Sequence, residues 1–159
     1  MKTFIQLLFI AAVSAGPMSR SNTRPIQLYS KTGKFMNILE NGKVLGKRGR
    51  QHGTAILEQV SVGRNKFILR GVTSGLYIEI SRNHKIHGVP FPTKATMFSE
   101  EVVENNFLSF RLADNHRCRL SLMKKAYRIS CSAKIQANKI SFLPRKTHLP
   151  SRLYHGTFV

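Results

Sequence analysis

The C-terminal part of the chain concentrates cationic side chains and contains no acid. Residues 115–159 include ten Lys or Arg and no Asp or Glu, and the 159-residue chain has 26 Lys and Arg against 7 Asp and Glu. Clustered cations bind polyanions through charge pairing and counterion release, so such binding weakens as salt rises. The sequence therefore predicts a polyanion site, with a solvated surface that only keeps the protein soluble as the alternative.

The candidate binding residues belong to two short segments of this stretch. They lie in or beside a predicted hairpin turn and on the approach to the last predicted strand: Lys124, Lys125, Arg128, Lys134, Asn138 and Lys139. A turn and an adjacent loop can present fixed cations to several sulfate groups at once. Outside a cell, this charge favours a sulfated polysaccharide or an acidic membrane surface over nucleic acid as the partner.

Residue types that support catalysis or metal binding do not occur in suitable patterns. The six His are scattered, and His84 and His87 stand three apart in a turn and strand, so their side chains point to opposite faces. No Gly-x-Ser-x-Gly elbow, P-loop or zinc spacing occurs. A basic ribonuclease would suit the charge but would require paired His and more disulfides. We therefore expect no catalytic residues, no metal site and no enzymatic activity.

The two cysteines, Cys118 and Cys131, could face each other across a hairpin. If Met123–Ala126 closes this hairpin as a four-residue loop, Leu122 faces Tyr127 and the two cysteines are also opposed. Opposed Cβ atoms lie about 4.5–5.5 Å apart, close to disulfide range. An oxidising compartment favours the bond. Two buried thiols remain the alternative, because a register slip of one residue would separate them.

The N-terminal residues 1–15 have the pattern of a secretory signal peptide. Lys2 precedes an apolar run over residues 4–13, and Val13-Ser14-Ala15 supplies a suitable cleavage site. The run is too short to cross a bilayer comfortably, and no later stretch approaches the roughly 20 apolar residues of a membrane helix. We therefore expect a secreted, extracellular protein without membrane insertion, in which residues 16–26 form an N-terminal extension.

The elements that must position these side chains repeat three times along the chain. Short apolar alternations bounded by Gly, Asn or Pro predict strands, and Met36, Ile78 and Leu120 occupy equivalent places 42 residues apart. Asn41-Gly42, between two such alternations, predicts a hairpin turn. The returning strands also match, the third one residue late: Lys43–Gly46, Lys85–Gly88 and Arg128–Cys131.

Three units of four short strands each predict an all-β fold. Three propeller blades would leave too wide a central channel, and a solenoid would require capping repeats. A closed six-stranded barrel capped at one end by three hairpins satisfies the strand count, and this architecture is the β-trefoil. We expect the trefoil domain to span residues 27–144 and residues 145–159 to form a basic, flexible tail.

Several segments resemble the core of the fibroblast growth factor family: Leu28–Gly33, Asn41–Gly46, Gly75–Ile80 and Ile140–Pro144. The resemblance extends from about Gln27 to Pro144. His84, Thr96 and Phe107 stand where the family signature has Gly, Cys and Tyr. This divergence is typical of an outlying member, such as one from an invertebrate or a virus.

The resemblance implies heparan sulfate as a co-ligand and no other cofactor. The family's positions for this polysaccharide correspond to Lys124, Arg128, Asn138 and Lys139 and, on the first turn, to Thr32. Lys125 and Lys134 add charge beside them.

The resemblance also implies a contact surface for the immunoglobulin-like domains of a receptor tyrosine kinase ectodomain. The residues at these positions are Tyr29, Arg48, Glu100, Asn105, Asn106, Phe107 and Leu143. Arg145 stands where family members commonly place an apolar residue, which would weaken the apolar centre of this surface. From the residues alone, Tyr29 and Phe107 are ordinary strand aromatics.

Together these features predict a secreted growth factor that binds heparan sulfate and activates a receptor tyrosine kinase. The protein would act as a monomer that assembles on the polysaccharide. A trefoil cytokine or decoy that binds heparan sulfate without activating a kinase receptor is the alternative. A lectin trefoil would carry Gln-x-Trp in each repeat, and this chain has no Trp.

Overall fold

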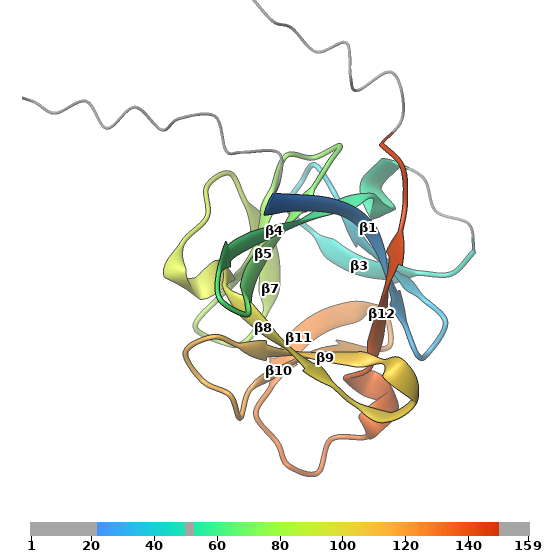
Figure 1. The fold of residues 1–159 in the computed structure, drawn as a ribbon, viewed down its shortest axis with the longest axis vertical. Helices are drawn as coiled ribbons and strands as arrows, with labels where there is room; N and C mark the ends of the chain where they lie inside the picture. Colours follow the sequence, from blue (N-terminus) through green and yellow to red (C-terminus); the bar gives the residue numbers. More distant parts are fainter. Residues whose placement is uncertain (1–21, 50–52, 150–159) are drawn as a thin grey trace, which may run out of the picture.

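The computed structural model describes residues 22–49 and 53–149, which are built from short strands (Figure 1). The strands are β1 Thr23–Ser30, β2 Phe35–Ile38, β3 Val44–Lys47, β4 Leu57–Gly63, β5 Lys66–Gly71, β6 Tyr77–Ile80, β7 Ile86–Val89, β8 Phe98–Val102, β9 Leu108–Leu112, β10 Arg119–Met123, β11 Ala126–Ser130 and β12 Phe142–Lys146. Short 3-10 turns link some of them: η2 Gly53–Ala55, η3 Lys94–Thr96, η4 Glu104–Asn106 and η5 Ala137–Lys139. The expected signal peptide lies outside the described residues. Within residues 22–49 and 53–149, no helix is long and apolar enough to span a bilayer.

Six of the strands close into a barrel. Antiparallel pairing runs from β1 to β12, β9, β8, β5 and β4, and β4 pairs with β1 again. Closure leaves no free edge strand in the barrel, since every member has a partner on both sides. The predicted six-stranded barrel is therefore confirmed.

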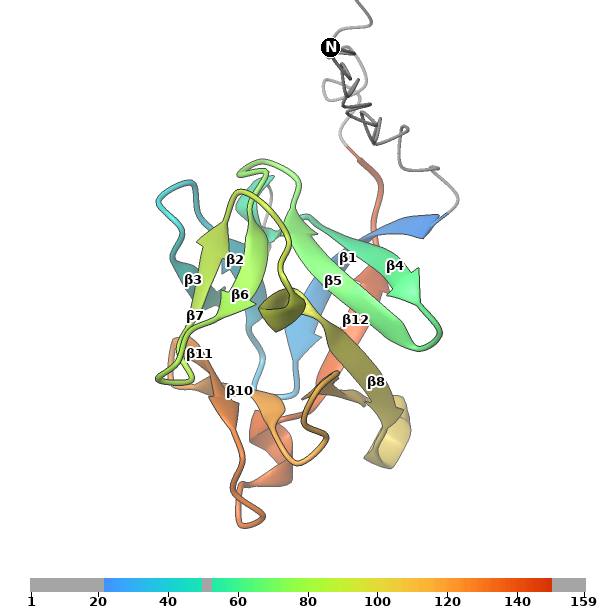
Figure 2. The same ribbon diagram turned by 90° about the vertical axis from the view of Figure 1, so that its left-hand side faces the viewer.

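The other six strands form three hairpins, β2–β3, β6–β7 and β10–β11, which stand together on one side of the barrel (Figure 2). We call these three hairpins the hairpin cap. Each hairpin pairs with another in the same way, through one residue pair and one backbone hydrogen bond. The residue pairs are Lys43 with His87, Lys85 with Arg128, and Ala126 with Leu45. In the hydrogen bonds, Gly88, Ile129 and Gly46 donate to the carbonyls of Gly42, His84 and Lys125 at 2.7, 2.9 and 2.8 Å. This threefold pattern confirms the β-trefoil.

The core fills the inside of the barrel and the space beneath the hairpins. Along β1, Ile26 and Leu28 are buried while the residue between them is only half-buried, as strand alternation requires. The Phe110 ring lies 5.1 Å from that of Phe67 and 5.9 Å from that of Phe142. Burial of each such side chain stabilises the fold by about 1.5–3 kcal/mol. Packing of apolar side chains therefore holds the barrel together.

The third hairpin differs from the other two in the length of its turn. Met123 pairs with Ala126, so only Lys124 and Lys125 form the loop. Lys124 adopts a positive φ of 57°, as tight two-residue turns require. Leu120 consequently pairs with Ile129, in the place that Met36–Gly46 and Ile78–Gly88 occupy in the other hairpins.

The sequence alignment of the third returning strand was therefore wrong. It matched Arg128–Cys131 to the other returning strands, whereas the structure matches Ala126–Ile129. The short turn brings this strand one residue early instead of one residue late. The expected four-residue loop Met123–Ala126 was also wrong, because Met123 and Ala126 pair with each other, but the predicted pairing of Leu122 with Tyr127 is confirmed.

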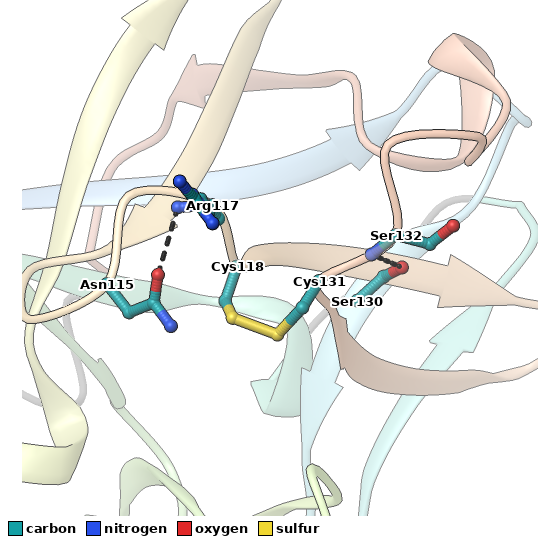
Figure 3. The surroundings of a disulfide bond; sticks show 6 residues. All are labelled: Asn115, Arg117, Cys118, Ser130, Cys131 and Ser132. Atoms are coloured by element: carbon teal, nitrogen blue, oxygen red, sulfur yellow. Dashed lines mark hydrogen bonds between the residues drawn. A yellow bond between two sulfur atoms is a disulfide. The ribbon is translucent and has the colours of Figure 1, made fainter.

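A disulfide joins Cys118 and Cys131 just beyond the paired part of the third hairpin (Figure 3). The two Cα atoms lie 4.0 Å apart, and Arg119 pairs with Ser130 immediately inside the bond. This register places the two cysteines opposite each other, as predicted. The bond ties the chain entering β10 to the chain leaving β11.

The barrel strands at the two ends of the domain are longer than the sequence pattern indicates. β1 begins at Thr23, where it pairs with Val60 of β4, and β12 continues to Lys146, which pairs with Ile26. The boundaries expected at residues 27 and 144 thus fall inside strands. Arg145 and Lys146 belong to the barrel because β1 offers a continuous ladder beside them.

Candidate functional site

A basic hollow lies between the third hairpin and the loop that leads to β12. It has a volume of about 440 Å³, and its lining includes Arg128, Lys134 and Lys139. Ser121 and Met123 of β10 form part of its wall. The structure therefore brings together cations that are up to 11 positions apart along the chain. We call this pocket, with Arg128, Lys134 and Lys139 in its lining, the basic hollow.

Local hydrogen bonds hold the backbone of the loop that carries Lys134 and Lys139. The Lys134 backbone N–H donates to Ser132 Oγ at 3.2 Å. The Lys139 N–H donates to the Gln136 carbonyl at 3.0 Å, and Ser141 Oγ donates to the Ala137 carbonyl at 2.7 Å. These hydrogen bonds give the loop a defined backbone conformation. Asn138 is exposed beside Lys139 in η5.

The hairpin tip beside the hollow carries Lys124 and Lys125, both exposed. Its position is fixed by the neighbouring first hairpin, because the Lys125 carbonyl accepts a hydrogen bond from Gly46 N–H at 2.8 Å. The Lys34 ammonium donates to the Lys124 carbonyl. Lys34 therefore adds a cation at this tip.

The β1–β2 turn contacts the far side of the same loop. The Lys31 N–H donates to the Ser141 carbonyl at 2.9 Å, directly after η5. Thr32 is half-buried, and its hydroxyl shares a 2.8 Å hydrogen bond with Ser30 Oγ. This turn, residues 31–34, thus lies between the hairpin tip and η5. Thr32 was predicted at this site, whereas Lys31 and Lys34 were not, because the acid-free stretch that indicates the site lies only at the C-terminal end of the sequence.

The cations around the hollow form no ion pairs with acids of the described residues, unlike several arginines elsewhere in the domain. Arg111 and Arg119 both pair with Glu101, and Arg70 pairs with Glu58 at 3.1 Å. By contrast, the following side chains form no ion pair within the described residues: Lys124, Lys125, Arg128, Lys134 and Lys139. Their charge is therefore available to an anion from outside the chain.

A second surface gathers aromatic side chains on β1 and β2. Tyr29 pairs across strands with Leu143, and its ring centroid lies 5.0 Å from that of Phe35. The Arg145 guanidinium lies over the Tyr29 ring at 4.3 Å, a cation–π arrangement. Arg145 therefore covers an aromatic ring, an interaction that its sequence position did not reveal.

Arg48 lies near the same aromatic group. A Cβ built on Gly33 would lie 3.4 Å from Arg48 Nη1 and 3.8 Å from the Tyr29 hydroxyl, so all three approach each other. Gly33 has a φ of 85°, which lets the β1–β2 turn close against them. The predicted residues Tyr29, Arg48 and Leu143 therefore share one surface.

The η4 turn places Phe107 beside this surface. Asn105 and Asn106 both have positive φ, 58° and 62°, a conformation that Asn tolerates better than most residues. The Lys31 ammonium lies 5.5 Å from the centroid of the Phe107 ring. The adjacent Leu108 pairs with Phe142 on β12. The β1–β2 turn thus contacts Phe107 through Lys31 and the hairpin tip through Lys34.

Glu100 belongs to a different part of the surface. Its side chain accepts a hydrogen bond from Gln59 Nε2, and Arg24 Nη2 donates to Gln59 Oε1 at 2.6 Å. These residues line a separate polar hollow of about 430 Å³, which also includes Asn65. Within residues 22–49 and 53–149, no described contact joins Glu100 to Tyr29 or its neighbours.

Comparison with known proteins identifies the family. The family model for fibroblast growth factor matches residues 24–143. Fibroblast growth factor 17 of Homo sapiens is 27% identical over 142 residues, covering 87% of this chain and 62% of the relative. Fibroblast growth factor 8b of Danio rerio is 34% identical over 100 residues, covering 60% of this chain and 47% of the relative.

Fibroblast growth factor 22 of Mus musculus is 27% identical over 94 residues, covering 59% of this chain and 58% of the relative. The chain thus spans about half to three-fifths of the length of these relatives. The family match covers both the barrel and the hairpin cap. The chain belongs to the fibroblast growth factor family.

Proposed function

We propose that this growth factor is secreted, binds heparan sulfate and activates a tyrosine kinase receptor of the fibroblast growth factor receptor type. One observation carries the proposal. Arg128 of the third hairpin and Lys134 and Lys139 of the loop before β12 line one hollow, and none of them forms an ion pair with an acid of the described residues. Sulfate groups spaced along a polysaccharide match such a cluster, because each can pair with a separate cation. Family membership supports a signalling ligand over an enzyme.

The surface around Tyr29 is the proposed receptor contact. It offers two aromatic rings and an arginine, types that are enriched at protein–protein hot spots and interfaces, beside a half-buried leucine. Asn105, Asn106 and Phe107 extend it along η4. Glu100 would meet the receptor at a separate point, because it lies in the other hollow.

The two proposed surfaces adjoin at the β1–β2 turn. Lys34 contacts the hairpin tip and Lys31 lies over Phe107. A polysaccharide in the basic hollow would therefore run close to a receptor bound at Tyr29. The sugar would raise the local concentration of ligand, and one long chain would help two receptors assemble around monomeric ligands.

Secretion and the domain limits belong to the same proposal. Residues 1–15 would serve as the signal peptide, the trefoil domain would extend to Lys146 at the end of β12, and residues 147–159 would form the C-terminal segment. The Cys118–Cys131 disulfide supports export, because such bonds persist in oxidising compartments.

Two charge reversals test the polysaccharide site. Lys124→Glu with Arg128→Glu should abolish retention on a heparin column, while circular dichroism and the melting temperature stay close to wild type, because both side chains are exposed. Lys66→Glu with Lys146→Glu, on exposed barrel positions, is the matched control and should elute only slightly earlier. Elution of the first variant at the wild-type salt concentration would refute the assigned site.

The receptor part is tested with cells that carry a fibroblast growth factor receptor. The proposal requires receptor phosphorylation that increases when heparan sulfate is added. A decoy is the second candidate, favoured by the Arg145 guanidinium that covers Tyr29. Heparin binding without phosphorylation would support the decoy.

A further inference from the structure

Cations from different hairpins stand opposite one another at the hairpin cap. Lys85 of the second hairpin pairs with Arg128 of the third, and Lys43 of the first pairs with His87 of the second. Lys43, Lys85 and Arg128 are all exposed. Residues directly opposed in an antiparallel pair have Cβ atoms about 4.5–5.5 Å apart, and like charges at such positions destabilise the sheet. The Lys85–Arg128 pair is thus a local concentration of positive charge.

No acid in the described part of the chain forms an ion pair with these three cations, although Glu40 lies three positions before Lys43 in the turn of the first hairpin. Glu79 lies at the cap, but its carboxylate pairs with His87 at 3.5 Å and accepts a hydrogen bond from Thr93 Oγ1 at 2.8 Å. Lys43, Lys85 and Arg128 form no ion pair among residues 22–49 and 53–149. An external anion would therefore relieve the repulsion between Lys85 and Arg128.

The backbone holds these cations in place before any ligand arrives. Gly88 N–H donates to the Gly42 carbonyl at 2.7 Å, and Ile129 N–H donates to the His84 carbonyl at 2.9 Å. These bonds join the three hairpins next to the cation positions. Binding a sulfate at the cap would therefore order only the ends of the side chains, which reduces its entropic cost.

We propose that Lys43, Lys85 and Arg128 form a second sulfate-binding site, which takes the continuation of the polysaccharide chain bound in the basic hollow. The inference rests on the proposed function. Arg128 connects the two sites, because it lines the hollow and is also the cross-strand partner of Lys85. A long sulfated chain occupies both sites, whereas a short one occupies the hollow alone.

Variants of the two new lysines test this site. Lys43→Gln with Lys85→Gln removes two cap charges, and Lys66→Gln with Lys146→Gln removes two exposed charges from the barrel as the matched control. Affinity for full-length heparin and for a heparin tetrasaccharide is measured by titration at several salt concentrations. The cap variant should bind full-length heparin at least tenfold more weakly and lower the magnitude of the salt slope by about one to two. Its tetrasaccharide affinity should match that of the control.

The possible results distinguish a failure of the cap site alone from a failure of the proposed function. If wild type fails to bind heparin, the proposed function falls and the cap site with it. If wild type binds but the cap variant and the control weaken equally, only the cap site is refuted. Equal loss on the tetrasaccharide and on full-length heparin would also refute it, because the two sites would then be one. A melting temperature of the cap variant at or above that of wild type at low salt shows that the variant is folded.

Discussion

Loss of the Cys118–Cys131 disulfide should lower the free energy of unfolding by about 3 kcal/mol. The bond links residues with a sequence separation of 13. Closing a loop of that length removes about 10 cal/mol/K of entropy from the unfolded chain, or about 3 kcal/mol at 25 °C. Cys118→Ala with Cys131→Ser suits the two positions, because the first side chain is buried and the second is exposed.

Guanidinium unfolding of the double variant, oxidised wild type and reduced wild type measures this difference. The variant and the reduced protein should unfold at similar denaturant concentrations, both well below oxidised wild type. For a domain of this size, 3 kcal/mol corresponds to a melting temperature lower by about 9–15 °C. The reasoning is refuted if the variant stays within about 1 kcal/mol of oxidised wild type, which is within the ordinary effect of a point substitution.

Two further substitutions test the buried phenol and the covered aromatic ring. Tyr127 is buried and its hydroxyl has no hydrogen-bond partner within the described residues, so Tyr127→Phe should stabilise the protein by about 1–2 kcal/mol in thermal unfolding. Burial raises the pKa of Tyr127, so wild type should also lose about 1.4 kcal/mol per pH unit above pH 10, which the variant retains. Equal pH profiles for the two proteins would contradict this. Arg145→Ala should uncover Tyr29 and raise affinity for a receptor ectodomain about two- to fivefold, the equivalent of a 0.5–1 kcal/mol cation–π contact, in a surface plasmon resonance titration. Lys146→Ala is the control, and an unchanged Arg145→Ala affinity would exclude Tyr29 from the contact.

The sequence was enough to predict the barrel because its signal is repeated. Met36, Ile78 and Leu120 hold the same place in three hairpins, and all three are buried. For the cysteines, the sequence offered a disulfide or two buried thiols, because the bond depends on the register of the hairpin; the observed register brings them together. The third returning strand was misaligned because Ile129 resembles Ile86, whereas Tyr127 is the residue that occupies the place of Ile86.

The parts of the site that escaped prediction depend on contacts between distant segments. Lys34 reaches the Lys124 carbonyl across 90 positions, and Arg145 covers Tyr29 from a neighbouring strand. The separation of Glu100 from Tyr29 likewise depends on how the barrel curves. Residue types predict which side chains can bind, but the closed sheet decides which of them meet.

Because the turn of the third hairpin has only two residues, the affinity of its tip for sulfate should fall less with rising temperature than that of a flexible loop. The ladder continues to the Met123–Ala126 pair, so Lys124 and Lys125 extend from the end of a rigid β-ribbon. The backbone freedom of this tip is already lost when the protein folds. Grafting the tip onto a smaller stable β-hairpin should therefore preserve much of its attraction for sulfate, whereas a longer, glycine-rich loop with the same charges would bind less well as temperature rises.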